Sequence, residues 1–177
     1  MKAQEGIMAI KKSKSTYKSA WFALAVTRIL LGFVFLWAFL DKTFGLGFAT
    51  TAEKAWVAGG SPTTGFLKMG VNPESPFASF FNGLAGNGLV DVLFMVGLLG
   101  IGVALIAGAG LRIAAVAGTI LLVLMWAASL PLANNPLIDD HIVYAAVLWV
   151  IAAGRRDFSV ADWWTNLDFV KKNKWLW

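Results

Sequence analysis

Long uncharged segments constrain the fold of this chain more than any other feature of its sequence. Residues 20–40 carry one charge, Arg28, residues 89–109 carry one, Asp91, and residues 113–130 carry none. A hydrocarbon core about 30 Å thick is crossed by about 20 helical residues, so each segment is predicted to span a membrane. Charged residues make up 14% of the chain. Soluble domains carry about 25%, which excludes a soluble enzyme and a nucleic-acid-binding module.

A fourth apolar segment, residues 142–153, is too short to cross a membrane alone, because at about 1.5 Å per residue it is about 18 Å long. Asn135 followed by Pro136 is typical of a helix N-cap and first helical residue. We therefore expect the fourth span to cover residues 136–154. This start places three polar residues about one turn below the membrane surface: Asp139, Asp140 and His141.

The predicted fold is an all-α membrane protein, a four-transmembrane-helix bundle in a single domain, residues 1–177. A helical outer cap joins the first and second helices, and both termini are cytoplasmic. In chain order the expected segments are a basic N-terminal segment (1–19), the first span (20–44), the outer cap (45–87), the second (88–109), third (112–131) and fourth (136–154) spans, and an amphipathic interfacial tail (155–177).

Lysine and arginine set the expected orientation, because they are enriched in cytoplasmic loops. With both termini in the cytoplasm, eleven of them fall on the cytoplasmic side and three on the outer side. The cytoplasmic ones are Lys2, Lys11, Lys12, Lys14, Lys18, Arg112, Arg155, Arg156, Lys171, Lys172 and Lys174. The outer ones are Lys42, Lys54 and Lys68. The asymmetry predicts a multi-pass protein with both termini inside.

The outer cap has the sequence signals of three short helices. Thr50 and Glu53 have the spacing of a capping box, and Gly59 is the expected stop. Ser61 and Ser75, each followed by proline, are expected to open two more helices. Aromatic residues give these helices apolar faces, so we expect the cap to lie over the outer mouth of the bundle.

The C-terminal tail is predicted to be a helix that lies on the membrane surface and contacts the lipid bilayer. Its apolar residues fall on one face at helical spacing: Val160, Trp163, Trp164, Leu167 and Val170. The lysines and tryptophans that follow are typical of an interfacial anchor.

Arg28 is the most unusual residue of the spans, because it lies close to the middle of the first one. A charge there costs about 2.5–3.5 kcal/mol even on the most lenient insertion scale. We therefore expect a buried partner or a ligand for Arg28. Phe35 and Lys42 follow at intervals of seven residues and share its helix face.

The other ionisable residues of the spans lie at the outer helix ends, beneath the expected cap. Asp140 and Tyr144 are four residues apart and share one helix face. If these faces turn inward, the bundle holds a polar pocket near the outer surface, with Arg28 deeper. The alternative is structural: Asp91 and Asp139 would stabilise helix N-termini, His141 would be a hydrogen-bond partner, and Asp41 with Lys42 would mark the membrane exit. No metal site is predicted, because three consecutive residues of a helix cannot all face one ion.

The cysteine and histidine content limits the redox chemistry that the chain can perform. It contains no cysteine and one histidine. Iron–sulfur ligation, thiolate zinc and bis-histidine or covalent haem are therefore excluded. The glycine-rich motif of flavin- and nicotinamide-binding folds is also missing. Any redox chemistry must come from a diffusible cofactor or a partner.

Four stretches of the sequence resemble the DoxX/DoxD family of membrane proteins. They are residues 28–42 (RILLGFVFLWAFLDK), 53–66 (EKAWVAGGSPTTGF), 93–102 (LFMVGLLGIG) and 135–144 (NPLIDDHIVY). The chain is most similar to the actinobacterial-type branch described as the large, DoxD-like subunit of thiosulfate:quinone oxidoreductase. The resemblance covers about residues 20–165. It implies a four-helix bundle in the bacterial plasma membrane.

The resemblance also implies electron transfer from thiosulfate to a membrane quinone, with a small DoxA-like subunit as partner. The residues expected to bind the quinone are Arg28, Phe35, Lys42 and Tyr144, and the expected catalytic residues are Asp140, His141 and Asp91. Arg28 or His141 would donate a hydrogen bond to a quinone carbonyl, and an aspartate would pass protons to the outer water. The outer side carries six acids against three lysines, which repels thiosulfate and points to a partner for its oxidation.

The alternative function is a non-catalytic membrane scaffold. Such a protein would dock a soluble redox enzyme or join a respiratory complex. It would depend on the tail or the cap and not on the charges within the spans.

Overall fold

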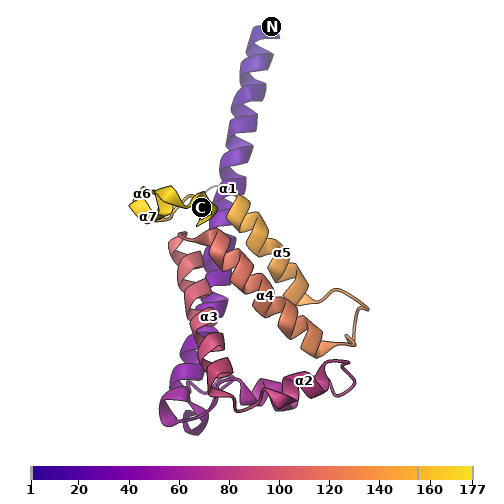
Figure 1. The fold of residues 1–177 in the computed structure, drawn as a ribbon. Helices are drawn as coiled ribbons and strands as arrows, with labels where there is room; N and C mark the ends of the chain where they lie inside the picture. Colours follow the sequence, from indigo (N-terminus) through magenta and orange to yellow (C-terminus); the bar gives the residue numbers. More distant parts are fainter. Residues whose placement is uncertain (1, 155, 177) are drawn as a thin grey trace.

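The computed structural model consists of helices, turns and loops, with no strand among the residues that it describes. These are the backbone of residues 2–154 and 156–176 and the side chains of residues 18–154 and 156–176. Met1, Arg155 and Trp177, which belong to the predicted basic segment and tail, lie outside the described residues. The bundle is formed by α1 (Lys2–Phe44), α3 (Gly88–Ala107), α4 (Leu111–Ser129) and α5 (Asp140–Ala153) (Figure 1).

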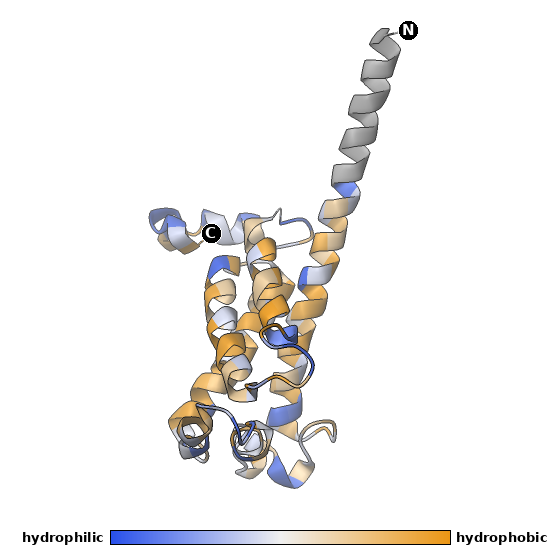
Figure 2. Ribbon diagram, turned by 90° about the vertical axis from the view of Figure 1, so that its right-hand side faces the viewer, coloured by the Kyte–Doolittle hydropathy of each residue, from blue (hydrophilic) through white to orange (hydrophobic). Residues whose placement is uncertain are grey.

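Three of the described helices are long and apolar enough to cross a membrane: Lys18–Phe44 of α1, α3 and α4. The C-terminal end of α1 and both ends of α3 and α4 lie within two residues of the bounds expected from the sequence, whereas α1 continues without a break through the expected basic segment to Lys2. Helix α5 is also apolar but has only 14 residues, or about 21 Å of helix. Figure 2 shows apolar residues along the middle of the bundle and polar residues gathered at its two ends.

The predicted start of the last helix is wrong. Helix α5 begins at Asp140, with Asp139 as its N-cap, and Asp139 accepts a hydrogen bond from the N–H of Ile142 at 3.3 Å. The Asn135 side chain does accept hydrogen bonds from two N–H groups that follow it, as an N-cap would. No helix continues from there, however, because Asp139 has extended backbone (φ −126°, ψ −172°). A tight turn therefore precedes the helix, which starts four residues later than expected.

Two glycines bring α1 and α3 close together. A Cβ at Gly32 would lie 2.9 Å from the Ile106 side chain, and one at Gly102 would lie 2.8 Å from the backbone nitrogen of Leu36. Small residues allow such close backbone approach in membrane bundles. Phe35, one of the predicted quinone-binding residues, is packed into this core and is 5% exposed.

The segment between α1 and α3 closes one end of the bundle, which we call the cap end (Figure 1). It contains η1 (Ala52–Lys54), η2 (Trp56–Ala58), the single π-helical turn η3 (Phe66–Gly70) and α2 (Ala78–Gly83). The predicted capping box is wrong, because η1 follows Thr51 and has no side-chain cap. Gly59 does end η2, with a left-handed backbone (φ 86°). Ser61 and Ser75 each accept a hydrogen bond from an N–H two or three residues later.

The C-terminal tail lies at the opposite end of the bundle, the tail end, beside the turn that joins α3 to α4 (Figure 1). It consists of α6 (Ala161–Asn166), α7 (Asp168–Lys172) and η4 (Lys174–Leu176). The expected single helix is interrupted because Leu167 has extended backbone (φ −64°, ψ 133°). Its apolar residues consequently divide: Val170 is fully buried, whereas Trp163 is 62% exposed.

Arg28 joins the turn before the tail to the bundle through hydrogen bonds. Its Nη2 donates hydrogen bonds to the backbone oxygens of Asp157 at 3.2 Å and Phe158 at 2.7 Å. The N–H of Val160 also donates to the backbone oxygen of Ala107, at the end of α3, at 2.9 Å. The side chain of Arg28 is 2% exposed, so these carbonyls replace the water that the guanidinium has lost.

We predict that Arg28→Met loosens the tail. The substitution preserves an apolar stem but removes the charged donor that binds two partly buried carbonyls, at a cost of about 1.5–3 kcal/mol in the free energy of unfolding. Tail cleavage by a protease, followed by mass spectrometry in detergent, should accelerate. Lys18→Met, an exposed cation of the same helix, is the control. Equal cleavage of the two variants would contradict this role of Arg28.

Candidate functional site

The structure does not bring the seven predicted site residues into one pocket. Arg28 lies at the tail end, where it contacts the carbonyls of the 157–158 turn. Lys42 lies 14 positions further along α1, about 21 Å away along the helix axis. Phe35 is part of the core between them. The predicted residues therefore form separate groups.

The guanidinium of Arg28 sits at the C-terminal end of α3. A Cβ at Gly108, the C-cap of α3, would overlap Nη1 of Arg28, and Gly108 has a left-handed backbone (φ 71°). The C-terminal end of a helix favours a cation. Nη1 itself has no hydrogen-bond partner among the described groups. The buried partner expected for Arg28 is thus the protein backbone.

Asp41 organises the start of the cap. It is 2% exposed and accepts hydrogen bonds from the N–H groups of Phe48 at 3.2 Å and Ala49 at 3.0 Å. Its own backbone oxygen accepts from Gly45 at 2.8 Å, closing the end of α1. Asp41 therefore does more than mark the end of a span: it turns the chain back toward the bundle.

Asp91 fixes the middle of the cap to α3. Its Oδ1 accepts hydrogen bonds from the Ser61 hydroxyl at 2.9 Å, the Thr63 hydroxyl at 2.5 Å and the Thr63 N–H at 3.2 Å. Asp91 is 7% exposed, so this carboxylate has exchanged water for three protein donors. The N-terminus of α3 is capped separately by Asn87.

An apolar cavity of about 200 Å³ lies between the bundle and the cap. Figure 1 shows α3 and α4 diverging from their connecting turn toward the cap end, where α2 lies across the opening. The cavity occupies this region and is lined by Lys42 of α1, Thr63, Phe66, Leu67, Phe81 and Leu84 of the cap, Val90 and Phe94 of α3, and Leu121, Leu124 and Met125 of α4.

Lys42 is the only charged residue among those that line this cavity. Its ammonium lies 5.9 Å from the centre of the Phe94 ring, at the outer limit of a cation–π contact. It makes no hydrogen bond with another residue in the described part of the chain. This half-buried ammonium, which can donate three hydrogen bonds, therefore has no acceptor among the described side chains and carbonyls.

Asp91 reaches the same cavity through one intermediary. Thr63 lines the cavity, and its hydroxyl donates to the Asp91 carboxylate. The structure thus places one predicted site residue, Lys42, in the cavity wall, and a second, Asp91, behind Thr63. Sequence analysis missed Thr63 and Phe94 as members of this site. The only signal for Thr63 was its position beside the Ser61-Pro62 turn.

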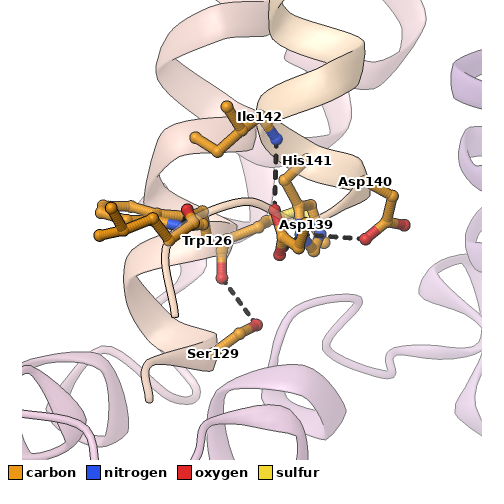
Figure 3. A network of polar contacts seen from close by, with 8 residues as sticks. Trp126, Ser129, Asp139, Asp140, His141 and Ile142 are labelled. Carbon is orange, nitrogen blue, oxygen red and sulfur yellow. Dashed lines mark hydrogen bonds and ion pairs between the residues drawn. The ribbon is translucent and has the colours of Figure 1, made fainter. Parts of the chain in front are cut away.

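Asp139, Asp140 and His141 form a separate cluster at the start of α5, beside Trp126 of α4 (Figure 3). Nδ1 of His141 lies 2.8 Å from the Asp139 carboxylate and 3.7 Å from that of Asp140. Burial raises the pKa of the Asp139 carboxyl, but hydrogen bonds from His141 and the Ile142 N–H lower it further, so the pKa lies below its usual value. This contact is the structural hydrogen bond that was one alternative for His141.

The geometric argument against a metal at this cluster is wrong. One potential ligand atom from each of the three residues lies within 4.8 Å of the others. They converge because Asp139 precedes the helix, so the three residues are not all helical. The Asp140 side chain is 70% exposed, as is common for surface acids that bind no ion.

Tyr144 belongs neither to the cavity that Lys42 lines nor to the cluster of Asp139, Asp140 and His141. It is 38% exposed and lines a shallow groove between α1 and α5 with Leu31 and Val34. The predicted polar face that Asp140 and Tyr144 share therefore does not open into the cavity that contains Lys42.

Known proteins provide no template for this arrangement. Comparisons of the chain with protein-family models, curated proteins and solved structures found no match. The resemblance to the DoxX/DoxD family stays a prediction.

We predict that Asp91→Ala separates the cap from α3. It removes the acceptor of three hydrogen bonds and should cost about 1–3 kcal/mol in the free energy of unfolding. Thermal unfolding in detergent measures the effect. The control is Asp140→Ala, which removes an exposed carboxylate of α5 and should leave stability unchanged. Similar melting of both variants would show that the Asp91 contacts do not hold the cap.

Proposed function

We propose that this chain is a quinone-interacting integral membrane subunit of an oxidoreductase, and that the quinone head group binds in the cavity beneath the cap. One observation carries the proposal: Lys42, whose ammonium lies 5.9 Å from the Phe94 ring, is the one charged residue among those that line a mainly apolar cavity between helices of membrane-spanning length. A quinone is apolar except for its carbonyl oxygens, which accept hydrogen bonds. The cavity and the head group are therefore chemically complementary.

The size of the cavity also fits a head group. Pockets for drug-sized ligands hold about 300–1,000 Å³, whereas this one holds about 200 Å³. It accommodates a ring and not a complete long-chain molecule. Phe94 supplies an aromatic wall beside the ammonium, against which a flat ring can stack.

Lys42 and Asp91 have different roles in this proposal. The Lys42 ammonium donates a hydrogen bond to a carbonyl oxygen and stabilises the negative charge that develops there on reduction. Asp91 exchanges protons with the cavity through the Thr63 hydroxyl, which lies between them. Arg28, Asp140, His141 and Tyr144 do not line the cavity and have no part in the binding of the head group.

The proposed topology has four spans, with α5 as the fourth and both termini in the cytoplasm of a bacterium. The excess of lysine and arginine near the tail end supports this orientation. At about 21 Å, α5 is shorter than the hydrocarbon core, so the turn at residues 135–139 would lie in the interface. The cap and its cavity then face the outer side.

The electrons are proposed to come from a protein partner, with thiosulfate as the donor that the family resemblance implies. The sequence has no cysteine and thus no cluster ligands of its own. A thiosulfate dianion at the cavity would find one ammonium, that of Lys42, while the buried carboxylates of Asp41, its chain neighbour, and of Asp91, behind Thr63, oppose a second negative charge. Its oxidation to tetrathionate is therefore assigned to the partner, such as a small DoxA-like subunit.

We predict that Lys42→Met weakens quinone binding. Loss of a hydrogen bond from a charged group costs about 1.5–3 kcal/mol, which corresponds to about tenfold or more in affinity. Titration of the purified protein with a quinone, followed by tryptophan fluorescence, measures the dissociation constant. Lys54→Met, an exposed lysine of the cap, is the matched control. Unchanged affinity in Lys42→Met would overturn the proposed site.

The second candidate function is a membrane scaffold for a soluble redox enzyme or a respiratory complex. It is favoured by the aromatic residues exposed at the tail end: Trp163 is 62% exposed, and Phe169 and Trp175 are each 64% exposed. If this function is correct, Trp163→Ser with Trp175→Ser abolishes co-purification of a redox partner, while Lys42→Met changes neither that association nor electron transfer. The opposite pattern supports quinone binding.

A further inference from the structure

We infer that the apolar groove between α3 and α4 holds the prenyl side chain of the quinone, so that the protein selects long-chain prenylated quinones over quinones without a side chain. This inference rests on the proposed function, since it takes the head group to lie in the cavity beneath the cap. It adds the substrate class and the position of the rest of the molecule.

The groove has a volume of about 700 Å³ and is lined, like the cavity, by residues of α3 and α4. The N-cap of α4, Gly110, and the α4 residues Ala114 and Ala117 line the groove, and Leu121 and Leu124 follow them in the cavity. These positions recur every three or four residues and form one stripe on the helix. The groove and the cavity are therefore consecutive along one side of α4.

Helix α3 shows the same continuity. Phe94 lines the cavity, and Gly97, three residues later, lines the groove, which then extends to Ala107. The part of α3 from Val96 to Ala107 is about 17 Å long. An extended chain of several prenyl units fits this length.

The direction of the groove follows from how the cavity is enclosed. Lys42 of α1 lies on one side of the cavity, and cap residues such as Phe66 and Phe81 cover its end. Leu124 of α4 is 47% exposed, and Val96, the first groove residue of α3, is 61% exposed. A side chain attached to a ring in the cavity therefore leaves between α3 and α4, directly into the groove.

The tail closes the far end of the groove. Trp163 and Trp164 of α6 line it there together with Val160, and Trp164 Nε1 donates a hydrogen bond to the backbone oxygen of Leu176 at 3.3 Å. Apart from the two indoles, every residue that lines the groove is glycine or aliphatic. This lining offers van der Waals contact and no site for a polar head group.

A tethered chain has an advantage over free lipid in such a groove. Lipid tails are as apolar as the groove, so the hydrophobic effect does not favour one occupant over another. A prenyl chain whose ring is already bound is present at a high effective concentration. We therefore expect the side chain to raise quinone affinity by a factor of about three to ten, less than the contribution of Lys42.

Gly97→Leu tests the inference. A Cβ at Gly97 meets no atom within 4 Å, so the larger side chain fills the groove without disturbing the packing of the bundle. The control is Gly88→Leu, which places the same substitution at an open position of the same helix outside the groove and the cavity. Both are compared with the unchanged protein in phosphatidylcholine nanodiscs.

Dissociation constants are measured for a menaquinone with several prenyl units and for menadione, which has the same ring without the chain. Gly97→Leu should weaken menaquinone binding by about three- to tenfold and leave menadione binding unchanged. Gly88→Leu should change the binding of neither quinone. If Lys42→Met weakens the binding of both quinones but Gly97→Leu weakens neither, the head-group site stands and the groove assignment fails. If no variant affects either quinone, the proposed function itself fails.

A menaquinone analogue with a diazirine on its prenyl chain gives a second, structural readout. Photolysis should attach it to peptides that contain residues 96–107 of α3. Labelling confined to α5 or the outer face of α1 would overturn the groove assignment. Native mass spectrometry gives two further results that would overturn the groove assignment. One is a dimer that Gly97→Leu abolishes. The other is a bound phospholipid that Gly97→Leu displaces while the affinity for quinone stays unchanged.

Discussion

A charge inside a membrane protein is stable only where groups of the protein replace the water that it has lost, and this constraint organises the structure. Three buried charges meet it by binding segments that lie outside the helices. Arg28 binds the carbonyls of the turn before the tail. Asp41 and Asp91 bind N–H and hydroxyl groups of the cap. The charged residues of the spans thus hold the two ends of the bundle in place.

The candidate site is a consequence of the same constraint. Because Asp91 draws Thr63 against α3, the cap lies close enough to cover the space between α3 and α4. Lys42 lines that space and has no hydrogen-bond acceptor among the described residues. A cation in this position favours an amphiphilic ligand that carries a hydrogen-bond acceptor. The proposed quinone site therefore depends on the residues that hold the cap as much as on the residue that would contact the ring.

The helices of the bundle were predictable, whereas the grouping of their polar residues was not. Uncharged length decides which segments can span a membrane, and it is a local property of the chain. The start of α5 was misplaced because Asn135 and Asp139 are both capable caps and only their backbone geometry distinguishes them. Arg28 and Lys42 share a face of α1, but a shared face does not mean a shared pocket on a helix of this length.

The sequence by itself determined that the chain forms apolar helices of membrane-spanning length, where they lie, and that Arg28 needs a buried partner. These properties follow from composition, periodicity and the cost of an unpaired charge. Only the tertiary structure decided that this partner is the backbone before the tail. It also decided that Lys42 lines a cavity whose Thr63 binds Asp91, while His141 pairs with Asp139 elsewhere. The reason is physical: the divergence of α3 from α4 and the position of the cap arise from contacts between residues far apart in the chain, which local patterns do not encode.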